Sequence, residues 1–515
     1  MQVNMRSLYL LPFAAIVVFL LFLWQGRTGF NLADEGYLWY GVQRVMLGET
    51  PIYDFHSYYP GRYYWSAALM SLWHDNGIIS LRITVSIFQA LGLFIALALI
   101  ARSTAGWKRN SWLWLLISTL LLIVWMFPRQ KLFDISLSIF LVAVLVFFIE
   151  RPSAARHLLV GFAIGVIAFF GQNHGFYGVM GLFIAMIYKK IRQSHSEQPG
   201  FFQGLGLSAL SALAGFLIPM SILAVLQPGF VGAFWDDIFS LFMRKSTNFP
   251  LPIPWPWLIP FASLSAGEAL RQFLIGLFFV ALPLCSVIFL GLIFYRCCTG
   301  KPTSPIFAAT VCLTPVYAHY AYSRADLGHL CQGIFPFLLA CLLSFLERGP
   351  ALRWTSALAL LLASFWVMLP VQPGWQCRKS EDWVKVEISG DKLLVDPGTA
   401  SNINLLRSLA ERYAPNGRSF IAAPFWPGAY AVLERRSPMW EIYPILPRPE
   451  SFERKEIERI KATHPGFAIV LDSPLDGKEE LRYRNSHPQT FQYIAENFEL
   501  ISDSFGQTTI FIAKD

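Results

Sequence analysis

Residues 8–40 read LYLLPFAAIVVFLLFLWQGRTGFNLADEGYLWY. The first half of this stretch, Leu8–Trp24, is an apolar run long enough to cross the hydrocarbon core of a bilayer. Arg6 precedes the run and no convincing small-residue cleavage site follows it, so we expect a retained membrane span rather than a signal peptide. Two adjacent carboxylates, Asp34 and Glu35, follow shortly after the chain leaves this span.

The composition of the whole chain also indicates a membrane protein. Of its 515 residues, 55% are hydrophobic and only 14% are charged, whereas soluble domains carry about 25% charged residues. The net charge of +8 arises mostly in short segments between apolar runs, where Lys and Arg orient helices. No stretch combines clustered basic residues with a nucleic-acid-binding pattern, so we expect membrane lipids and no nucleic acid among the partners.

Apolar runs of spanning length recur through the first two-thirds of the chain. Each must be helical, because lipid offers no hydrogen-bond partner to a free backbone amide. The sequence therefore predicts a polytopic α-helical membrane domain, residues 1–369, with about 11 transmembrane helices at 8–24, 81–101, 111–127, 133–149, 157–171, 175–188, 205–226, 272–295, 305–321, 330–346 and 353–369.

The distribution of Lys and Arg predicts the orientation. If the N-terminus is cytoplasmic, every inner connection is short and basic, as the positive-inside rule requires. An odd number of spans then places the C-terminal domain outside the cytoplasm. We expect a multi-pass protein of the plasma (inner) membrane, with a first outer loop at residues 25–80 and a second, rich in proline and tryptophan, at 227–271.

Residues 370–515 predict a small extracytoplasmic α/β domain. Helices are expected at 401–413 and 451–463, with Ser451 as the N-cap of the second. Short buried strands are expected at 419–423, 467–471 and 508–513.

The acidic pair Asp34-Glu35 is the first candidate site. A carboxylate near hydrocarbon is partly desolvated, which moves its pKa toward the range useful for a general base. The alternative is structural, with Asp34 as the N-cap of an amphipathic helix through Val45. The two interpretations are compatible, because a capping Asp can still face a site.

An aromatic-rich turn, residues 51–61, follows in the same loop. It reads PIYDFHSYYPG, and its Asp54, His56 and Tyr58, with Arg62 just beyond, are candidate substrate-binding residues. Aromatic rings stack on sugar faces, while Asp and His hydrogen-bond hydroxyls. The alternative is a packed interfacial turn in which Asp54 caps a helix.

Charged residues mark three later links between predicted spans. Arg129 and Lys131 lie on the predicted outer side, against the orientation rule. Either they bind the phosphate of a substrate, or they anchor the protein to lipid headgroups by snorkelling. Arg324, Asp326 and His329 lie in another such link, where the alternative is an internal Arg324–Asp326 ion pair. The third link contributes the polar corner 172–174, whose His174 we include among the substrate-binding candidates.

Carboxylates, aromatics and cations gathered on one predicted membrane face suit the transfer of a sugar from a lipid phosphate. A carboxylate takes the acceptor proton, and cations stabilise the departing phosphate. A single in-line displacement would invert the anomeric carbon. The set requires no cofactor; a divalent metal shared by Asp34, Asp54 and Asp326 remains an option.

These residues resemble the GT-C superfamily of integral-membrane glycosyltransferases, and in particular the bacterial protein-mannosyltransferase-like and aminoarabinose-transferase-like enzymes. The likeness lies in the Asp34-Glu35 pair, the Tyr53-Asp54-Phe55 turn ending in Pro60-Gly61, and Arg324-Ala325-Asp326-x-x-His329, and covers roughly residues 1–370. The resemblance implies a catalytic base from the first outer loop and a polyprenyl- or dolichyl-phosphate sugar donor.

Two other function classes remain open at this point. A transporter or flippase of lipid-linked sugars would use the same cations and aromatics without a base, but it is expected to carry charge deep inside its spans. An O-antigen ligase or polymerase also acts on lipid-linked glycans, but such enzymes usually place their large active loop late in the chain. For the favoured glycosyltransferase, the acceptor is a lipid, a glycan or a protein.

Overall fold

The computed structural model describes residues 9–104, 111–192, 199–243, 249–505 and 508–514. The chain forms two compact units. The first, here the helical unit, comprises Met1–Leu23, Val85–Ile222 and Asn248–Trp375. The second, here the mixed unit, comprises Trp24–Thr84, Leu223–Thr247 and Gln376–Asp515.

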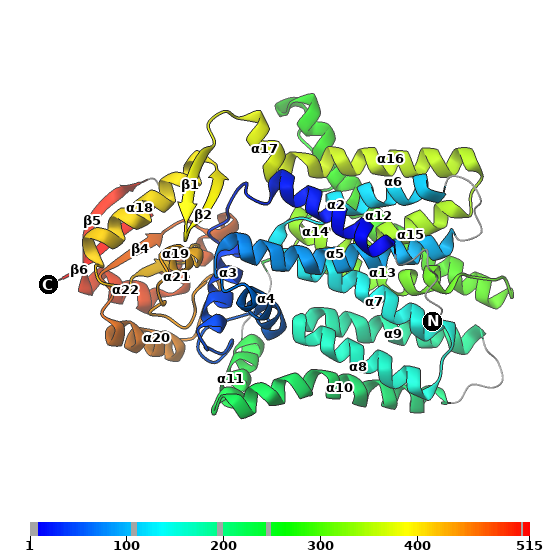
Figure 1. Cartoon of the computed structure of the whole chain (residues 1–515), viewed down its shortest axis with the longest axis horizontal. Coiled ribbons are helices and arrows are strands. Elements are labelled where there is room, and N and C mark those ends of the chain that lie inside the picture. The colour runs from blue at the N-terminus through cyan, green and yellow to red at the C-terminus, as the bar shows by residue number, and fades with distance from the viewer. Residues whose placement is uncertain (1–8, 105–110, 193–198, 244–248, 506–507, 515) are drawn as a thin grey trace. The chain divides into compact units, whose positions relative to one another are not determined.

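In the helical unit, long helices lie side by side (Figure 1). A helix or helix pair occupies every range predicted to span the membrane. The α-helices are α2 (Leu10–Gln25), α5 (Ile78–Ser103), α6 (Ser111–Trp125), α7 (Leu132–Glu150), α8 (Ala154–Phe170), α9 (Gln172–Arg192), α10 (Phe201–Leu226), α12 (Ala266–Cys298), α13 (Pro305–Ser323), α14 (Leu327–Gly333), α15 (Phe335–Leu346) and α16 (Pro350–Met368). Short 3₁₀ turns are η1 (Arg129–Lys131), η2 (Pro256–Leu258), η3 (Phe261–Ser263) and η4 (Leu369–Val371).

Within the described residues, five helical segments are long and apolar enough to cross a membrane, and the bent pair α14–α15 brings the number to six. Helices α2, α6 and α8 are apolar but shorter. The polytopic helical fold is thus confirmed, while the number of crossings and the orientation of the termini stay predictions. Helix α7 is the most enclosed of the five segments: 78% of its apolar window is buried, against 17% for α10.

The predicted continuous span 330–346 is wrong in one respect, because the structure breaks it at Ile334. Helices α14 and α15 meet there at a bend of 54°. Pro336, in the first turn of α15, has no N–H to donate and its ring disfavours helical continuation from the preceding turn. Gly333 lies against α13, where an added Cβ would come within 2.6 Å of the Tyr317 carbonyl oxygen. The break therefore sets a short helix, α14, closely against α13.

The mixed unit combines first-loop helices with the C-terminal α/β fold. Its helices are α3 (Asp34–Met46), α4 (Pro60–Leu72), α11 (Phe230–Met243), α17 (Pro373–Lys379), α18 (Pro397–Tyr413), α19 (Gly428–Val432), α20 (Glu450–Thr463), α21 (Tyr483–Ser486) and α22 (Pro488–Asn497), with 3₁₀ turns η5 (Leu475–Gly477) and η6 (Glu479–Leu481). Its strands are β1 (Val384–Ile388), β2 (Asp391–Val395), β3 (Ile421–Ala423), β4 (Phe467–Leu471), β5 (Phe498–Phe505) and β6 (Thr508–Ala513).

The main sheet has the strand order β3-β4-β6-β5. Strand β3 pairs parallel to β4, and the other pairs are antiparallel. Ile421, Val470 and Phe511 belong to its buried apolar core, together with Ile460 of α20. The predicted strands at 467–471 and 508–513 are confirmed, and the one at 419–423 shortens to Ile421–Ala423. A small α/β domain is therefore present, as predicted.

Two details of this domain differ from the prediction. Helix α20 begins at Glu450 with Pro449 as its N-cap and no side-chain capping bond, so Ser451 is not the cap. The hairpin β1–β2 was not predicted. It turns at Ser389 and Gly390, whose φ values of 48° and 82° match a two-residue hairpin turn of the type that twists with its strands.

The first loop folds together with the C-terminal residues. An added Cβ on Gly36 would lie 2.4 Å from the Cα of Gly428, so α3 and α19 touch backbone to backbone. The Gly428 N–H donates to the Leu32 carbonyl at 2.8 Å, and the His56 N–H donates to the Trp440 carbonyl at 2.8 Å. The sequence predicted a domain boundary between residues 369 and 370. In the structure, residues 24–84 belong to the same compact unit as residues 376–515.

Candidate functional site

At the start of helix α3, Asn31 and not Asp34 accepts the first backbone N–H groups. The Asn31 side-chain oxygen accepts the backbone N–H groups of Ala33 and Asp34, at 2.8 and 3.0 Å. Asn31 thus satisfies the first donors of the helix, the role that the sequence offered to Asp34. Within the described part of the chain, the half-buried Asp34 carboxylate makes no hydrogen bond and no ion pair. Its oxygens are available to accept a proton.

The neighbouring Glu35 is in the opposite situation. Arg82 donates from Nε to Glu35 Oε1 and from Nη2 to Glu35 Oε2, each at 2.8 Å. The side chains of the pair are only 2% and 5% exposed. Arg82 also donates to the carbonyls of Gly26 and Gly29, at 2.8 and 2.6 Å. This fork ties the start of α3 to the segment that leaves the first span. Glu35 therefore has a structural partner, whereas the Asp34 carboxylate has none among the residues that the structure describes.

The turn at 50–62 is held mainly by its own contacts. Asp54 Oδ2 accepts the Thr50 N–H at 2.7 Å, and the Asp54 N–H donates to the Thr50 carbonyl at 2.9 Å. Asp54 therefore closes the turn that the sequence identified. Arg62 is buried, with its guanidinium 5.0 Å from the centroid of the Tyr59 ring. The contacts of Asp54 and Arg62 within this turn are sufficient to explain why both residues are there.

His56 and Tyr58 surround the buried phenol of Tyr37, one helical turn beyond Asp34. The Tyr37 hydroxyl donates to the His56 carbonyl at 2.9 Å and lies 3.1 Å from His56 Nδ1. The rings of Tyr37 and Tyr58 are 4.8 Å apart, and Tyr58 is exposed. Trp440 adds a ring 5.1 Å from that of His56. These four rings form an aromatic cluster within the mixed unit.

In the helical unit, Arg129 and Lys131 form the 3₁₀ turn η1, directly before α7 begins at Leu132. Both side chains are half-buried. The N-terminal end of a helix carries positive partial charge, which favours anions and disfavours cations. Arg129 and Lys131 therefore lie at a helix end whose own dipole favours an anion, and their binding of a phosphate stays a prediction.

Arg324, Asp326 and His329 make a compact set between α13 and α14. Arg324 Nε donates to Asp326 Oδ2 at 2.7 Å, and Asp326 Oδ1 accepts the His329 N–H at 2.8 Å as the N-cap of α14. His329 Nδ1 lies 3.0 Å from the same oxygen. Burial disfavours ionisation of Asp326, but hydrogen bonds and charge from His329, and the bond from Arg324, outweigh it and lower the pKa of Asp326 to about 2. The internal ion pair foreseen as the alternative is present.

His174 is fully buried, with both ring nitrogens engaged by protein. Nε2 lies 2.9 Å from Asp134 Oδ1, and Nδ1 lies 2.6 Å from the Tyr317 hydroxyl. A substrate could reach this imidazole only by displacing those partners, and a role of His174 in substrate binding stays a prediction. Sequence reasoning missed Asp134, although a lone acid beside an apolar run is itself a signal.

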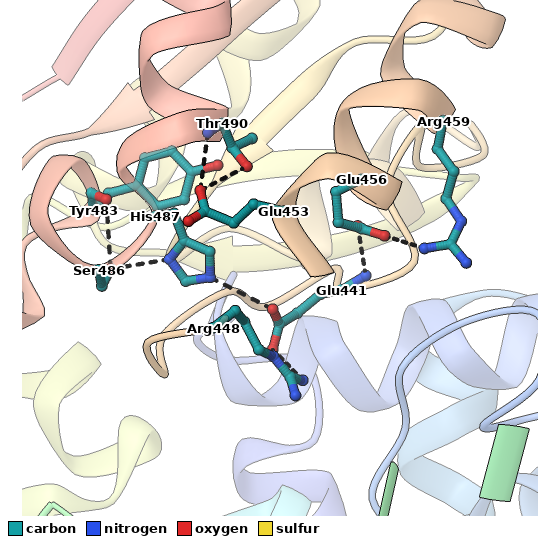
Figure 2. A network of polar contacts seen from close by, with 9 residues as sticks. All are labelled: Glu441, Arg448, Glu453, Glu456, Arg459, Tyr483, Ser486, His487 and Thr490. Atoms are coloured by element: carbon teal, nitrogen blue, oxygen red, sulfur yellow. Dashed lines mark hydrogen bonds and ion pairs between the residues drawn. The ribbon is translucent and has the colours of Figure 1, made fainter. Parts of the chain in front are cut away.

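The mixed unit also holds a buried polar network that the sequence did not reveal (Figure 2). Arg448 Nε donates to Glu441 Oε1 at 2.8 Å, and His487 Nε2 lies 3.5 Å from Glu441 Oε2. Burial alone would raise the pKa of Glu441, but the charge of Arg448 and the contact with His487 lower it well below its ordinary value. These residues come from separate segments of sequence, and only the fold brings them together.

Glu453 and Glu456, both on α20, extend this network. Glu453 Oε2 accepts the N–H and the hydroxyl of Thr490 in the first turn of α22, at 2.9 and 3.1 Å. Glu456 accepts the Glu441 N–H at 3.1 Å and pairs with Arg459. The network joins α20, α22 and the loop that carries Glu441, and its visible role is structural.

Among the residues that the structure describes, no group of three or more His, Cys, Asp or Glu side chains is placed to hold a metal ion. Two of the acids proposed to share a metal are otherwise engaged, Asp54 with Thr50 and Asp326 with Arg324 and His329.

Comparison with known proteins shows the fold. No protein-family model matches the chain, and no curated protein matches it either. Its structure is similar to that of ArnT from Cupriavidus metallidurans in the apo state, with a TM-score of 0.50 and 13% identity over 98% of this chain and 97% of that one. The same ArnT bound to undecaprenyl phosphate gives a TM-score of 0.48, at 13% identity over 98% and 97%.

A further similar structure is the Archaeoglobus fulgidus oligosaccharyltransferase tethered to an acceptor peptide, with a TM-score of 0.45 and 10% identity over 100% of this chain and 74% of that one. The likeness to apo ArnT shows an ArnT-like fold, and it confirms the helical membrane domain with a small C-terminal α/β part that was expected from the sequence.

Proposed function

We propose that this protein is an integral-membrane glycosyltransferase that moves a sugar from a polyprenyl-phosphate donor to an extracytoplasmic lipid, glycan or protein. The observation that carries the proposal is Asp34, whose carboxylate has no protein partner among the described residues, beside Glu35, whose two carboxylate oxygens both accept hydrogen bonds from Arg82. The fold shared with ArnT, an aminoarabinose transferase, supports the same class of reaction.

Asp34 is the base in this mechanism. The acceptor oxygen attacks the anomeric carbon as its proton passes to the Asp34 carboxylate. The bond between the anomeric carbon and the phosphate oxygen breaks, and the polyprenyl phosphate departs with the bonding electron pair. A single displacement of this kind inverts the anomeric carbon. General-base assistance contributes about 10²- to 10⁴-fold to such steps.

Glu35 and Arg82 position the base rather than react. Their bidentate ion pair fixes the first turn of α3 against the carbonyls of Gly26 and Gly29. A base held by rigid neighbours keeps the geometry that proton transfer requires. Glu35 thereby orients Asp34 through the backbone.

The departing phosphate needs cations, because its charge grows as the glycosidic bond breaks. We assign this role to Arg129 and Lys131 at the positive end of α7, and to Arg324 and His329 at the start of α14. Asp54, His56, Tyr58 and Arg62 belong to the turn assigned to sugar recognition. In that turn, the exposed Tyr58 ring is the best placed to stack on a sugar, because Asp54 and Arg62 are held by Thr50 and Tyr59.

The test compares Asp34→Asn with wild type in membranes supplied with radiolabelled polyprenyl-phosphate sugars, using a panel of hexoses and pentoses. We expect loss of transfer by about 10²- to 10⁴-fold. Glu49→Gln is the matched control, since it neutralises another acid of the same unit whose partners are Arg44 and Arg436. Full turnover by Asp34→Asn would remove Asp34 from the mechanism.

A transporter of lipid-linked sugars is the second candidate, because the helical unit does hold a buried acid and histidine, Asp134 and His174. The same membranes separate the two functions. Movement of labelled lipid across sealed vesicles without a new glycoside would favour transport, whereas a new glycoside favours transfer.

A further inference from the structure

Three helices of the helical unit each contribute one buried polar side chain to a common cluster. Asp134 comes from α7, His174 from α9 and Tyr317 from α13. Their exposed fractions are 3%, 0% and 0%. His174 lies between the other two, 2.9 Å from the carboxylate and 2.6 Å from the phenol.

The hydrogen bonds define how these groups are used. An ionised carboxylate only accepts, so Nε2 of His174 must donate to Asp134. In a neutral imidazole, Nδ1 then accepts, and the Tyr317 hydroxyl donates to it. A charged or polar group in an apolar interior is costly unless it is paired in this way. Aliphatic side chains would join three helices without that cost, so the cluster needs a further reason.

The cluster continues toward α14 through Tyr320, one turn beyond Tyr317 on α13. The centroid of the Tyr320 ring lies 5.8 Å from that of His174 and 5.9 Å from that of His329. The Tyr320 hydroxyl donates to Gln332 Oε1 at 2.7 Å, and Gln332 Nε2 donates to the Gly328 carbonyl at 2.9 Å. A chain of contacts thus runs from the core of the unit to the residues of α14.

Helix α14 depends on such contacts for its position. It has seven residues and is separated from α15 by a bend of 54°. A helix this short is unstable by itself, because few backbone bonds repay its nucleation. The turn that opens α14 contains Asp326 and His329, and Arg324 lies two residues before Asp326 and pairs with it.

We propose that Asp134, His174 and Tyr317, with Tyr320 and Gln332, form a buried positioning network that holds α14 so that Arg324 and His329 bind the phosphate of the lipid-linked donor. The role of that phosphate rests on the proposed function. The network residues act through α14 and do not touch the reacting atoms.

The experiment uses the full-length protein in membranes, with Cys331 as a local reporter. Cys331 lies in α14, is 1% exposed and contacts Met368 at 3.7 Å. The background replaces the other six cysteines, Cys285, Cys297, Cys298, Cys312, Cys341 and Cys377, by serine or alanine. Two quantities are measured on each variant: the rate at which a membrane-permeant maleimide labels Cys331, and the dissociation constant of undecaprenyl phosphate.

Tyr317→Phe removes the hydroxyl that closes the cluster, and Tyr320→Phe removes the one that reaches Gln332. Each loses one buried hydrogen bond, so we expect faster Cys331 labelling and affinity for undecaprenyl phosphate that is roughly tenfold weaker. The matched control is Tyr188→Phe. Tyr188 is an equally buried tyrosine of α9, bonded to Arg192 at the far end of the same helix from His174, and both readouts should stay at wild-type values.

Two results would overturn the inference, and they differ from failure of the proposed function. An unchanged rate of Cys331 labelling in both variants would show that the cluster does not hold α14 in position. Faster Cys331 labelling with an unchanged dissociation constant for undecaprenyl phosphate would show that the position of α14 does not affect binding of that ligand. If the wild-type chain itself binds no undecaprenyl phosphate, the proposed function fails, and the ligand named here fails with it.

Discussion

Arg82 holds Glu35 by both carboxylate oxygens, at 2.8 Å each, in a pair that is almost completely buried. This relationship separates the roles of two adjacent acids that look equivalent in the sequence. One is sequestered by a guanidinium, and the other, Asp34, faces no partner in the described part of the chain. The separation leads to opposite predictions for their substitution.

Glu35→Gln should destabilise the protein, because it leaves the guanidinium of Arg82 buried without its counter-charge. Breaking a buried ion pair in this way costs about 3–5 kcal/mol. Thermal unfolding of the full chain in detergent measures the loss. The control is Glu458→Gln, whose ion pair with Lys461 is exposed to solvent and should cost much less. Equal decreases in melting temperature in the two variants would show that the buried Arg82–Glu35 pair stabilises the protein no more than the control pair does.

Asp34→Asn should behave in the reverse manner. No interaction among the described residues is lost with its charge, so we expect a change in unfolding free energy within about 0.5 kcal/mol. Transfer activity should nevertheless fall by at least about a hundredfold. A variant that loses activity only in proportion to a lowered melting temperature would indicate a structural role for Asp34.

Arg129→Gln combined with Lys131→Gln should weaken binding of polyprenyl phosphate. Hydrogen bonds to charged groups contribute about 1.5–3 kcal/mol each, which corresponds to roughly 10- to 100-fold in affinity per residue. Arg151→Gln is the matched control, since Arg151 is an exposed cation at the opposite end of α7. Unchanged affinity in the double variant would favour the alternative, in which the pair anchors the protein to lipid headgroups.

The helices of the helical unit could be predicted because lipid imposes one solution on an apolar run, whatever its neighbours are. The break at Ile334 was visible in Gly333 and Pro336, but hydrophobicity averaged over the run concealed it. Candidate residues were found where charge interrupts apolar sequence, as at Asp34 and Arg324. The partners of these residues could not be predicted. No local sequence pattern indicates that Arg82 pairs with Glu35, or that His174 lies between Asp134 and Tyr317.

The Glu441 network shows the same limit in the mixed unit. Glu441, Arg448 and His487 lie in segments without a distinguishing pattern, and each is ordinary in isolation. Their buried pairing depends on how α20 and α22 pack on the sheet, which is tertiary information. Sequence periodicity predicts which face of an element is buried, but it does not say which polar groups from distant segments will share that interior.

This network predicts how stability depends on pH. The folded-state pKa of Glu441 is lowered from an ordinary value of 4.5, so its stabilising contribution is fully present above about pH 4.5 and is lost as the pH falls toward the folded value. Glu456 has the opposite sign. Burial raises its pKa, so its contribution is present below its ordinary value and is lost as the pH rises through the folded value.

Glu441→Gln should therefore lower the melting temperature of the full chain near neutral pH, because it removes the carboxylate charge beside the buried guanidinium of Arg448, at a cost of about 3–5 kcal/mol. The difference from wild type should stay constant from about pH 6 to about pH 4.5 and should shrink from about pH 4.5 to about pH 3, because the unfolded wild-type chain then binds a proton at Glu441 while the folded chain keeps this carboxylate ionised. Glu456→Gln is the matched comparison and should gain on wild type as the pH rises. A Glu441→Gln deficit that stays constant over this range would mean that the network stabilises by shape and hydrogen bonds alone, and that the charge of Glu441 contributes nothing.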